Sequence, residues 1–424
     1  MTQVLSVRRT PVALAADATR HEFDALLSNL VGQIDGDGVS CFAAALDGTP
    51  VAAAGAGRAV VPASNLKLVT AAVALDVLKP DSTFTTSMLG NLAGDTVNGD
   101  LFFVGGGDAT LSDTGYPSAD PKHSYQIPVQ PFTKLDDLAD KIVAAGVRHV
   151  TGRLVGDESR YDTERYNPKW AADIVGVEAG PLSALLVDDG KVAFTDRLPA
   201  DGPPLAAARH LSDLLEARGV TISGGVATGT APPGTPLVTD IQSPALSDVV
   251  KEMLTTSDDN TAELMVKELG FKVKGVGSTE QGLEVVRETL TSWGVPMDGV
   301  ELFDGSGLSD VNHVTCELIM AVLGRSGVGE PLYEGLAIAG QTGTLAAQFG
   351  GTPVVGVLRA KTGTLHNARS LSGYVPSGDR LLRFSLVING EGAEKKAEPL
   401  WTELAHDLAT IPAAVDPATL APGA

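Results

Sequence analysis

A serine and a lysine, Ser64 and Lys67, stand three residues apart where the sequence predicts the start of a helix. Residues at this spacing lie on one face of a helix, so the Ser64 hydroxyl and the Lys67 amine can form a hydrogen bond. A serine hydroxyl is a weak nucleophile until a base takes its proton, and a lysine is such a base only where burial and nearby positive charge favour its neutral amine. By itself, the pair more often marks a solvated helix start with Ser64 near the cap.

A second group of residues suited to chemistry follows a strand pattern, at Lys361, Thr362, Gly363 and Thr364. A substrate backbone can lie along Gly363, which has no side chain, while Lys361 and Thr362 offer a cation and a hydroxyl to a terminal carboxylate. The backbone N–H groups of Thr364 and Ser64 would then form an oxyanion hole. In isolation, this pattern also fits a strand end followed by a hairpin turn.

A third group is the polar stretch Ser257, Asp258, Asp259 and Asn260, which lies between two apolar helical patterns. Helices on both sides would hold this loop rigidly and point Ser257 and one amide or carboxylate into a cleft. Alone, the stretch also fits a capped helix start with Ser257 or Asp258 as the cap.

The elements that position these groups come from both ends of the chain. A hairpin is predicted over 39–54, a helix begins near Pro62, and a strand at 382–388 precedes a helix at 400–408. These terminal elements are expected to share one sheet. Residues 83–240 instead alternate short strand-like segments with Gly, Asp and Pro turns, which predicts an inserted module.

The composition limits the classes of function. A chain of 424 residues favours two or three domains. Its formal net charge of −21 would repel nucleic acid and anionic lipid, so no nucleic-acid partner is expected. No apolar run approaches the roughly 20 residues that span a bilayer. The histidines lack metal-site spacing, and the glycines at 105–107 lack the spacing and the lysine of nucleotide loops, so neither a metal nor another cofactor is expected.

The two cysteines, Cys41 and Cys316, leave the redox compartment open. They could pair once or stay as thiols, and the apolar strand pattern around Cys41 favours buried free thiols. The apolar stretch at 11–16 is too short for a signal-peptide core, and the loose lead before the first helix pattern is compatible with a removed export segment or a trimmed chain.

The three groups, in this order, resemble the serine acyltransferases described by Ser-x-x-Lys, Ser-Asp-Asn and Lys-Thr-Gly. More narrowly, the chain is similar to the low-molecular-mass class C penicillin-binding proteins, the D-alanyl-D-alanine carboxypeptidase/endopeptidase family. The resemblance extends over nearly the whole chain, and further matching stretches lie at residues 62–68, 99–101, 106–111, 155–161, 180–185, 304–309 and 360–365.

The resemblance implies an α/β (α+β) fold: a serine β-lactamase/transpeptidase-like domain, with an antiparallel sheet flanked by helices. We expect this domain to comprise residues 1–82 and 241–424, interrupted by a β-rich accessory module at 83–240. The resemblance also implies cleavage of the terminal D-Ala from peptidoglycan stem peptides, covalent inhibition by β-lactams, and an extracytoplasmic location. The implied roles are nucleophile for Ser64, acylation base for Lys67, proton relay toward the leaving group for Ser257, carboxylate anchors for Lys361 and Thr362, and close backbone contacts for Gly363 and Thr364.

The sequence departs from the family pattern at one position. Counted back from Ala262 and Glu263, the place of the family's Asn is taken by Asp259, and Asn260 lies one residue later. A carboxylate there would pair with Lys67 or repel the substrate's own carboxylate, and either effect slows acylation. Alternatively, a local shift lets Asn260 supply the amide, so Asp259 and Asn260 both stand as substrate-binding candidates.

Other interpretations remain open. A β-lactamase shares the nucleophile and base, although it must also hydrolyse the acyl-enzyme quickly and normally lacks such a long insertion. Asp259 could instead mark a catalytically weak chain that binds or scaffolds the cell wall. The sequence leaves open the choice between carboxypeptidase and endopeptidase, and the oligomeric state. Three tempting features are interpreted as structural, namely residues 340–345, which repeat Thr-Gly-Thr-Leu without a lysine, and the side chains of Ser306 and His366.

Overall fold

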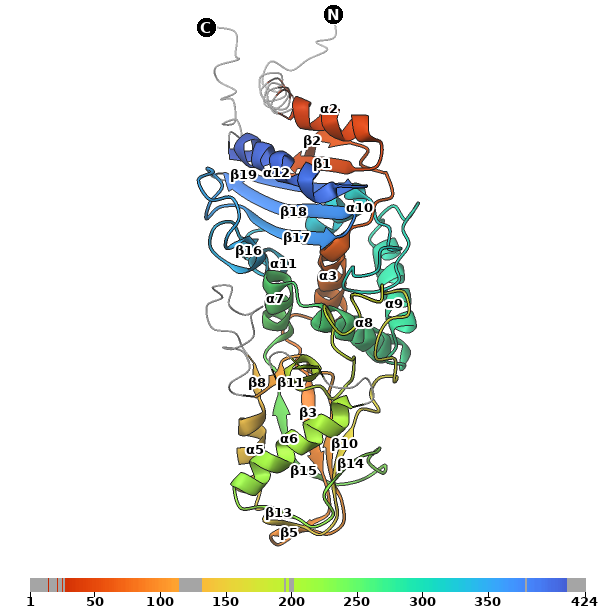
Figure 1. The fold of residues 1–424 in the computed structure, drawn as a ribbon, viewed down its shortest axis with the longest axis vertical. Helices are drawn as coiled ribbons and strands as arrows, with labels where there is room; N and C mark the ends of the chain where they lie inside the picture. Colours follow the sequence, from red (N-terminus) through yellow and green to blue (C-terminus); the bar gives the residue numbers. More distant parts are fainter. Residues whose placement is uncertain are drawn as a thin grey trace, which may run out of the picture.

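The computed structural model describes residues 27–113, 132–193, 196–197, 202–377 and 380–409, together with residues 14, 21 and 25. The molecule is elongated, with one sheet near the chain termini, a second sheet at the opposite end, and a layer of helices between them (Figure 1). In the described part of the chain, no helix is long and apolar enough to cross a membrane.

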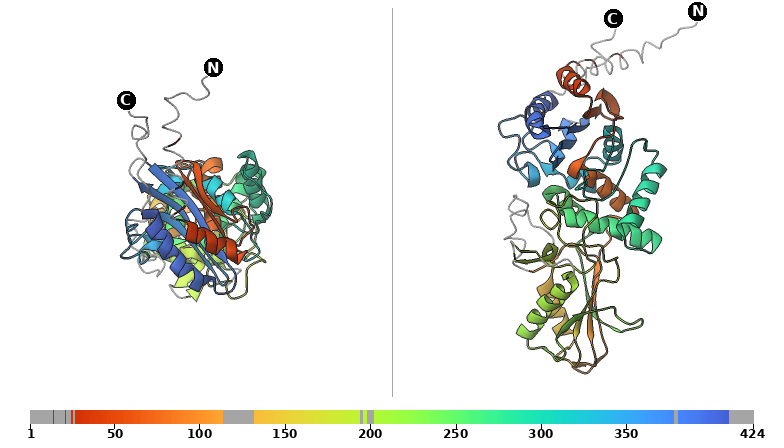
Figure 2. Two further views of the ribbon diagram at one scale, coloured as in Figure 1. Left: turned by 90° about the horizontal axis from the view of Figure 1, so that it is seen from above. Right: turned by 45° about the vertical axis from the view of Figure 1, so that its right-hand side comes forward.

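The first sheet joins the two ends of the chain, as the sequence predicts. Its six strands follow the order β16-β17-β18-β19-β1-β2, and all neighbours are antiparallel. Helices α2 and α12 cross over one face of it (Figure 2), where their apolar side chains form a shared core with the strands. The bounds are β1 Cys41–Leu46, β2 Thr49–Ala54, β16 Ala337–Ile338, β17 Arg359–Leu365, β18 Ala368–Ser377, β19 Arg380–Asn389, α2 Ser28–Asp37 and α12 Ala393–Ala409.

The helical layer is built around α3, which the sequence predicts from its apolar stripe of Leu66, Val69 and Val73. These side chains are fully buried, and α3 packs against helices on several sides. It ends at Lys79, where the backbone leaves the helix before Pro80. The bounds are α3 Leu66–Leu78, α7 Leu246–Thr256, α8 Asp259–Lys274, α9 Thr279–Ser292, α10 Cys316–Leu323 and α11 Pro331–Glu334.

The second sheet has a core of its own. Its strands follow the order β14-β10-β6-β3-β15, and α5 and α6 supply the apolar side chains that cover it. We propose that this core marks the inserted module at 83–240. The bounds are β3 Thr85–Leu89, β6 Leu101–Val104, β10 Leu154–Asp157, β14 Val226–Thr228, β15 Leu237–Gln242, α5 Leu135–Ala144 and α6 Pro203–Ala217; a smaller sheet holds β4 Leu92–Ala93, β5 Thr96–Val97, β9 His149–Val150 and β13 Thr221–Ile222, and two strand pairs hold β7 Leu111–Ser112, β8 Thr133–Lys134, β11 Lys191–Ala193 and β12 Asp196–Arg197.

The two cysteines form a disulfide, so the expectation of free buried thiols is wrong. Cys41 on β1 and Cys316 at the start of α10 have Cα atoms 6.0 Å apart, within the usual range for a disulfide. The apolar strand pattern around Cys41 correctly indicates burial. It could not reveal that the fold brings a cysteine 275 residues away onto the same face of the sheet.

Removing this disulfide is expected to lower the free energy of unfolding by about 3–5 kcal/mol, because the bond closes a very long loop in the unfolded chain. Urea unfolding of the parent and of a Cys41→Ser/Cys316→Ser variant measures the difference. The double variant also controls for other effects of the reductant. Dithiothreitol should destabilise the parent and leave the double variant unchanged. Equal midpoints for the parent with and without reductant would contradict the prediction.

Candidate active site

The loop that carries Ser64 enters α3 through a tight 3₁₀ turn, Ala63–Asn65. Ala63 has a φ of 49°, in the left-handed region that costs a non-glycine residue about 1–3 kcal/mol. Gly307 allows this close turn, because a Cβ on Gly307 would lie 1.9 Å from the Ala63 carbonyl oxygen. The turn therefore packs closely against Gly307, and it presents the Ser64 hydroxyl at the edge of a cleft.

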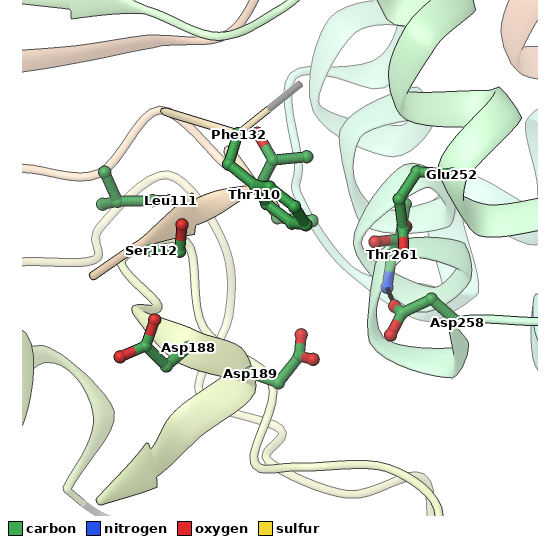
Figure 3. Close-up of a pocket in the computed structure, with 10 residues that line it drawn as sticks. Thr110, Leu111, Ser112, Phe132, Asp188, Asp189, Glu252, Asp258 and Thr261 are labelled. Atoms are coloured by element: carbon green, nitrogen blue, oxygen red, sulfur yellow. Dashed lines mark hydrogen bonds between the residues drawn. The ribbon is translucent and has the colours of Figure 1, made fainter. Parts of the chain in front are cut away.

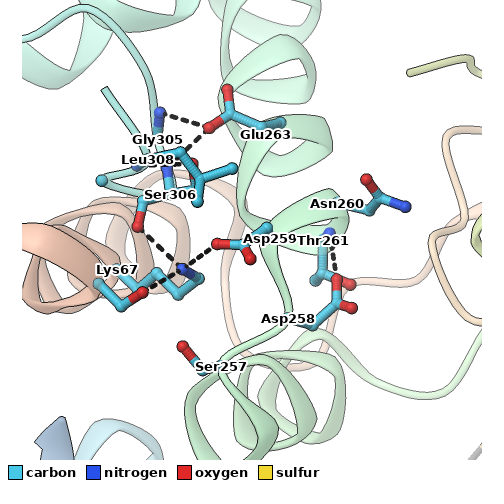
Figure 4. A network of polar contacts seen from close by, with 12 residues as sticks. Lys67, Ser257, Asp258, Asp259, Asn260, Thr261, Glu263, Gly305, Ser306 and Leu308 are labelled. Carbon is cyan, nitrogen blue, oxygen red and sulfur yellow. Dashed lines mark hydrogen bonds and ion pairs between the residues drawn. The ribbon is translucent and has the colours of Figure 1, made fainter. Parts of the chain in front are cut away.

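Lys67 is fully buried and its amine has three hydrogen-bond partners (Figure 4). Its Nζ lies 3.0 Å from Ser64 Oγ, 2.6 Å from Asp259 Oδ1 and 2.8 Å from the Ser306 carbonyl oxygen. A neutral amine has two N–H groups and one lone pair. If the N–H groups are directed to the carboxylate and the carbonyl, the lone pair is left facing the Ser64 hydroxyl, which is the geometry that a base requires.

The polar stretch lies at the junction of α7 and α8, between two apolar helices as predicted. Ser257 ends α7 in the left-handed conformation, with a φ of 67°. Asp258 caps α8 by accepting a hydrogen bond from the Thr261 N–H, 2.6 Å away. Ser257 and Asp259 face Lys67 (Figure 4), whereas Asp258 and Thr261 face a narrow pocket against Asp188 and Asp189 (Figure 3).

Asn260 lies outside the group around Lys67, so the local shift that would make it a substrate-binding amide does not occur. Its side chain accepts a hydrogen bond from the Gly180 N–H at 2.9 Å and donates one to the Asp189 carbonyl at 3.3 Å. The physical reason is the helix itself, in which consecutive side chains point about 100° apart. Because Asp259 is the first residue of α8 and points at Lys67, the Asn260 side chain points elsewhere, toward Gly180 and Asp189.

Lys361 lies on β17, which begins at Arg359. The apolar pattern of the sequence starts the strand earlier, at Val354, but residues 354–357 lie in turns. The Lys361 Nζ donates to Ser257 Oγ and to the Thr362 carbonyl, both at 2.8 Å. Burial lowers the pKa of the Lys361 amine well below its usual value; Lys67 lowers it further and Asp259 opposes both. The cationic form is therefore disfavoured until an anion enters the cleft to stabilise it.

Gly363 lies where β17 runs directly alongside the nucleophile turn. A Cβ there would lie 2.2 Å from Ser370 Oγ, 2.9 Å from the Pro62 carbonyl oxygen and 3.0 Å from the Ser64 nitrogen. Two of these atoms belong to the backbone that holds the nucleophile. Only a glycine allows the strand to approach Ser64 this closely.

Replacing Gly363 with alanine is expected to slow acylation of Ser64 by about 10-fold, since the added methyl group displaces β17 or the nucleophile turn. The rate of covalent labelling by a fluorescent penicillin measures the effect. A Gly350→Ala variant is the matched control, because nothing lies within 4 Å of a Cβ at that exposed position. A Gly363→Ala variant that reacts as fast as the Gly350→Ala control would contradict the prediction.

The three predicted groups line one cleft of about 830 Å³. From the sequence-predicted set, the side chains or backbone of six residues line it: Ser64, Ser257, Asp259, Thr362, Gly363 and Thr364. Lys67 and Lys361 lie directly behind them, fully buried and bonded to Ser64 and Ser257.

Sequence reasoning missed contributions from three residues. Thr344, in the repeated string interpreted as structural, lines the cleft and accepts a hydrogen bond from Thr362 Oγ1 at 2.9 Å. His366 is an exposed turn residue, as predicted, yet it also lines the cleft. Ser306 contributes only its backbone carbonyl. For Thr344, the repeat of Thr-Gly-Thr-Leu was a signal that the sequence offered. For Ser306, a backbone carbonyl is common to all residues, so no sequence pattern could indicate its role.

Comparisons with known proteins find relatives over most of the chain. The profile of the D-Ala-D-Ala carboxypeptidase 3 (S13) family matches residues 20–206 and 200–405. The chain is 31% identical over 419 residues to a D-alanyl-D-alanine carboxypeptidase from Actinomadura sp. (strain R39), covering 79% of this chain and 74% of the relative. It is 31% identical over 353 residues to carboxypeptidase DacB from Mycolicibacterium smegmatis, covering 78% and 72%.

Solved structures show the same fold. The crystal structure of penicillin binding protein 4 (dacB) from Haemophilus influenzae aligns with a TM-score of 0.72 at 20% identity, over 89% of this chain and 98% of that one. Bd3459, a predatory peptidoglycan endopeptidase from Bdellovibrio bacteriovorus, aligns with a TM-score of 0.59 at 16% identity, over 89% and 94%. The antiparallel sheet flanked by helices is therefore that of transpeptidase-like peptidases.

Proposed function

The chain belongs to the D-Ala-D-Ala carboxypeptidase 3 (S13) family, and we propose that it removes the terminal D-Ala of peptidoglycan stem peptides through an acyl-enzyme on Ser64. The observation that carries the proposal is the contact of Ser64 Oγ with the buried Lys67 amine, beside a strand that presents Thr362 and Gly363 to the same cleft. β-Lactams, which present a strained amide to the same nucleophile, would acylate Ser64 and inhibit the enzyme.

In the proposed acylation step, Lys67 Nζ takes the Ser64 hydroxyl proton while Oγ bonds to the carbonyl carbon of the penultimate D-Ala. The N–H groups of Ser64 and Thr364 stabilise the oxyanion. The C–N bond then breaks, and the leaving D-Ala amine receives the proton from Lys67 by way of Ser257. A water molecule hydrolyses the resulting ester and frees Ser64.

The substrate's terminal carboxylate is assigned to Lys361 and Thr362. The Lys361 amine is buried and lies 2.8 Å from Ser257 Oγ, so an arriving carboxylate would favour its protonated form. Substrate binding would thereby place a cation beside the relay hydroxyl when the leaving group needs a proton. The Thr362 hydroxyl, which donates to Thr344, can turn to the carboxylate.

The same proposal places the protein outside the cytoplasmic membrane, because that is where peptidoglycan stem peptides are found. The disulfide between Cys41 and Cys316 supports this location, since such bonds persist mainly in oxidising compartments.

The function is tested by incubating the purified protein with a stem pentapeptide that ends in D-Ala-D-Ala and measuring free D-Ala. We expect release by the parent and none by a Ser64→Ala variant. A cross-linked muropeptide dimer in a parallel reaction separates endopeptidase from carboxypeptidase activity. Folded parent protein that binds the peptide but releases no D-Ala would instead favour a catalytically weak, wall-binding relative, and rapid turnover of nitrocefin would favour a β-lactamase.

A further inference from the structure

The carbonyl that contacts Lys67 belongs to a tight, buried turn at residues 304–309, which we term the strap. Asp304 closes the strap from within, because its carboxylate accepts hydrogen bonds from the N–H groups of Gly307 at 2.9 Å and Ser309 at 2.7 Å. Trp170, from the inserted segment, donates to the same carboxylate at 3.0 Å. The Gly307 N–H belongs to the same peptide group as the Ser306 carbonyl, so Asp304 holds that peptide group directly.

The two peptide groups that precede this one are held by Glu263, one helical turn after Asp259 on α8. Glu263 Oε1 accepts hydrogen bonds from the Gly305 N–H at 3.0 Å and the Ser306 N–H at 2.8 Å (Figure 4). Its side chain is fully buried, and Oε2 has no hydrogen-bond partner among the described residues. From the other side, the Thr70 hydroxyl donates to the Gly305 carbonyl at 2.7 Å. The strap is thus tied to α8 and to α3.

We propose that Glu263 is a positioning residue for the acylation base, a role that rests on the proposed function of Ser64 and Lys67. By fixing the strap, Glu263 directs the Ser306 carbonyl at Lys67. Asp259 and this carbonyl together take the two N–H groups of the neutral amine, and the lone pair is left for the Ser64 proton. Without Glu263, two buried N–H groups lose their partner, and the peptide groups before Ser306 keep only the Thr70 contact, so the carbonyl can shift away from Lys67.

Glu263 is suited to this role as a neutral acid. Burial, and after it the neighbouring Asp304 carboxylate, raise the pKa of Glu263 to about 8. A neutral carboxyl still offers Oε1 as an acceptor to both N–H groups, and it brings no second negative charge to the helix face that carries Asp259. Glutamine has the shape and charge of that neutral acid, so Glu263→Gln preserves the proposed contacts while Glu263→Ala removes them.

The test compares second-order rate constants for acylation by benzylpenicillin at neutral pH, from intact mass over time. We expect Glu263→Ala to react about 10- to 100-fold more slowly than the parent, and Glu263→Gln to recover at least about a third of the parent rate. Saturation kinetics should assign the loss to the acylation step and not to reversible binding, because Glu263 does not line the cleft. Reaction of the parent itself tests the proposed function, so the two ideas fail separately.

A Glu268→Ala variant is the matched control. Glu268 is a second buried glutamate on α8, but it pairs with Arg160 at 2.7 Å and with Tyr161 at 2.9 Å, away from the strap. We expect it to lower the melting temperature without slowing acylation. If Glu263→Ala does not fold, Thr70→Val releases the strap from α3 and is expected to slow acylation by about 10-fold. The proposal is overturned if folded Glu263→Ala reacts at the parent rate, or if Glu263→Gln reacts as slowly as the alanine variant. If Glu263→Ala does not fold, a parent-like acylation rate in Thr70→Val overturns it.

Discussion

A Lys67→Ala variant is expected to lose acylation of Ser64 by at least about 1,000-fold. The Lys67 amine is the only base within hydrogen-bond distance of Ser64 Oγ among the described residues, and a positioned general base typically accounts for about 10²- to 10⁴-fold in rate. Removing it also leaves the Asp259 carboxylate buried without its ion partner. The measurement is the rate of adduct formation with benzylpenicillin, normalised to folded protein.

Lys267→Ala provides the control for this variant. Lys267 is likewise almost fully buried and ion-paired, with Asp162 at 2.6 Å, but it lies on α8, about two helical turns after Asp259. Its loss should cost stability, as the loss of a buried ion partner does, while acylation of Ser64 proceeds. If Lys67→Ala and Lys267→Ala react equally fast with the antibiotic, Lys67 is not the acylation base.

An Asp259→Asn variant is expected to gain in acylation rate by about 10- to 100-fold at neutral pH. The Asp259 carboxylate lies 2.6 Å from Lys67 Nζ, at ion-pair distance from an ammonium. An ammonium has no lone pair, so it cannot take the Ser64 proton. An asparagine keeps an oxygen in place as acceptor for the neutral amine but cannot form the ion pair. It also removes a charge that repels the substrate carboxylate.

The neighbouring Asp258→Asn variant is the control, since Asp258 carries the same charge but faces the inserted segment and caps α8. Asparagine is an equally good cap, so this variant should keep both its stability and its rate. Parallel acylation time courses at neutral pH compare the three proteins. An unchanged or lower acylation rate in Asp259→Asn would show that the Asp259 carboxylate does not slow acylation.

The residue types and spacings predicted much of the site because the chemistry needs those side chains at fixed offsets. Ser64 and Lys67 share a helix face, and Gly363 must be a glycine to approach them, so local rules were enough. The sheet that joins the two ends of the chain was also predictable, since a hairpin pattern marks β1 and β2 and alternating apolar residues mark β19.

The remaining features depend on tertiary contacts that no local pattern contains. The direction of Asn260 is set by which residue begins α8, and helix boundaries are uncertain by one or two residues in a sequence. The disulfide required knowledge of how β1 and α10 pack. The contact of Ser306 with Lys67 uses a carbonyl that every residue has, and Glu263 is recognisable as part of the site only because the strap folds against it.

The most direct test of the account is intact mass spectrometry of the parent and of a Ser64→Ala variant after incubation with benzylpenicillin. We expect one adduct per parent molecule, with the mass of the opened antibiotic, and none on the variant. An adduct on both proteins would place the nucleophile elsewhere. No adduct on the folded parent, even after prolonged incubation, would contradict an acyl-enzyme on Ser64.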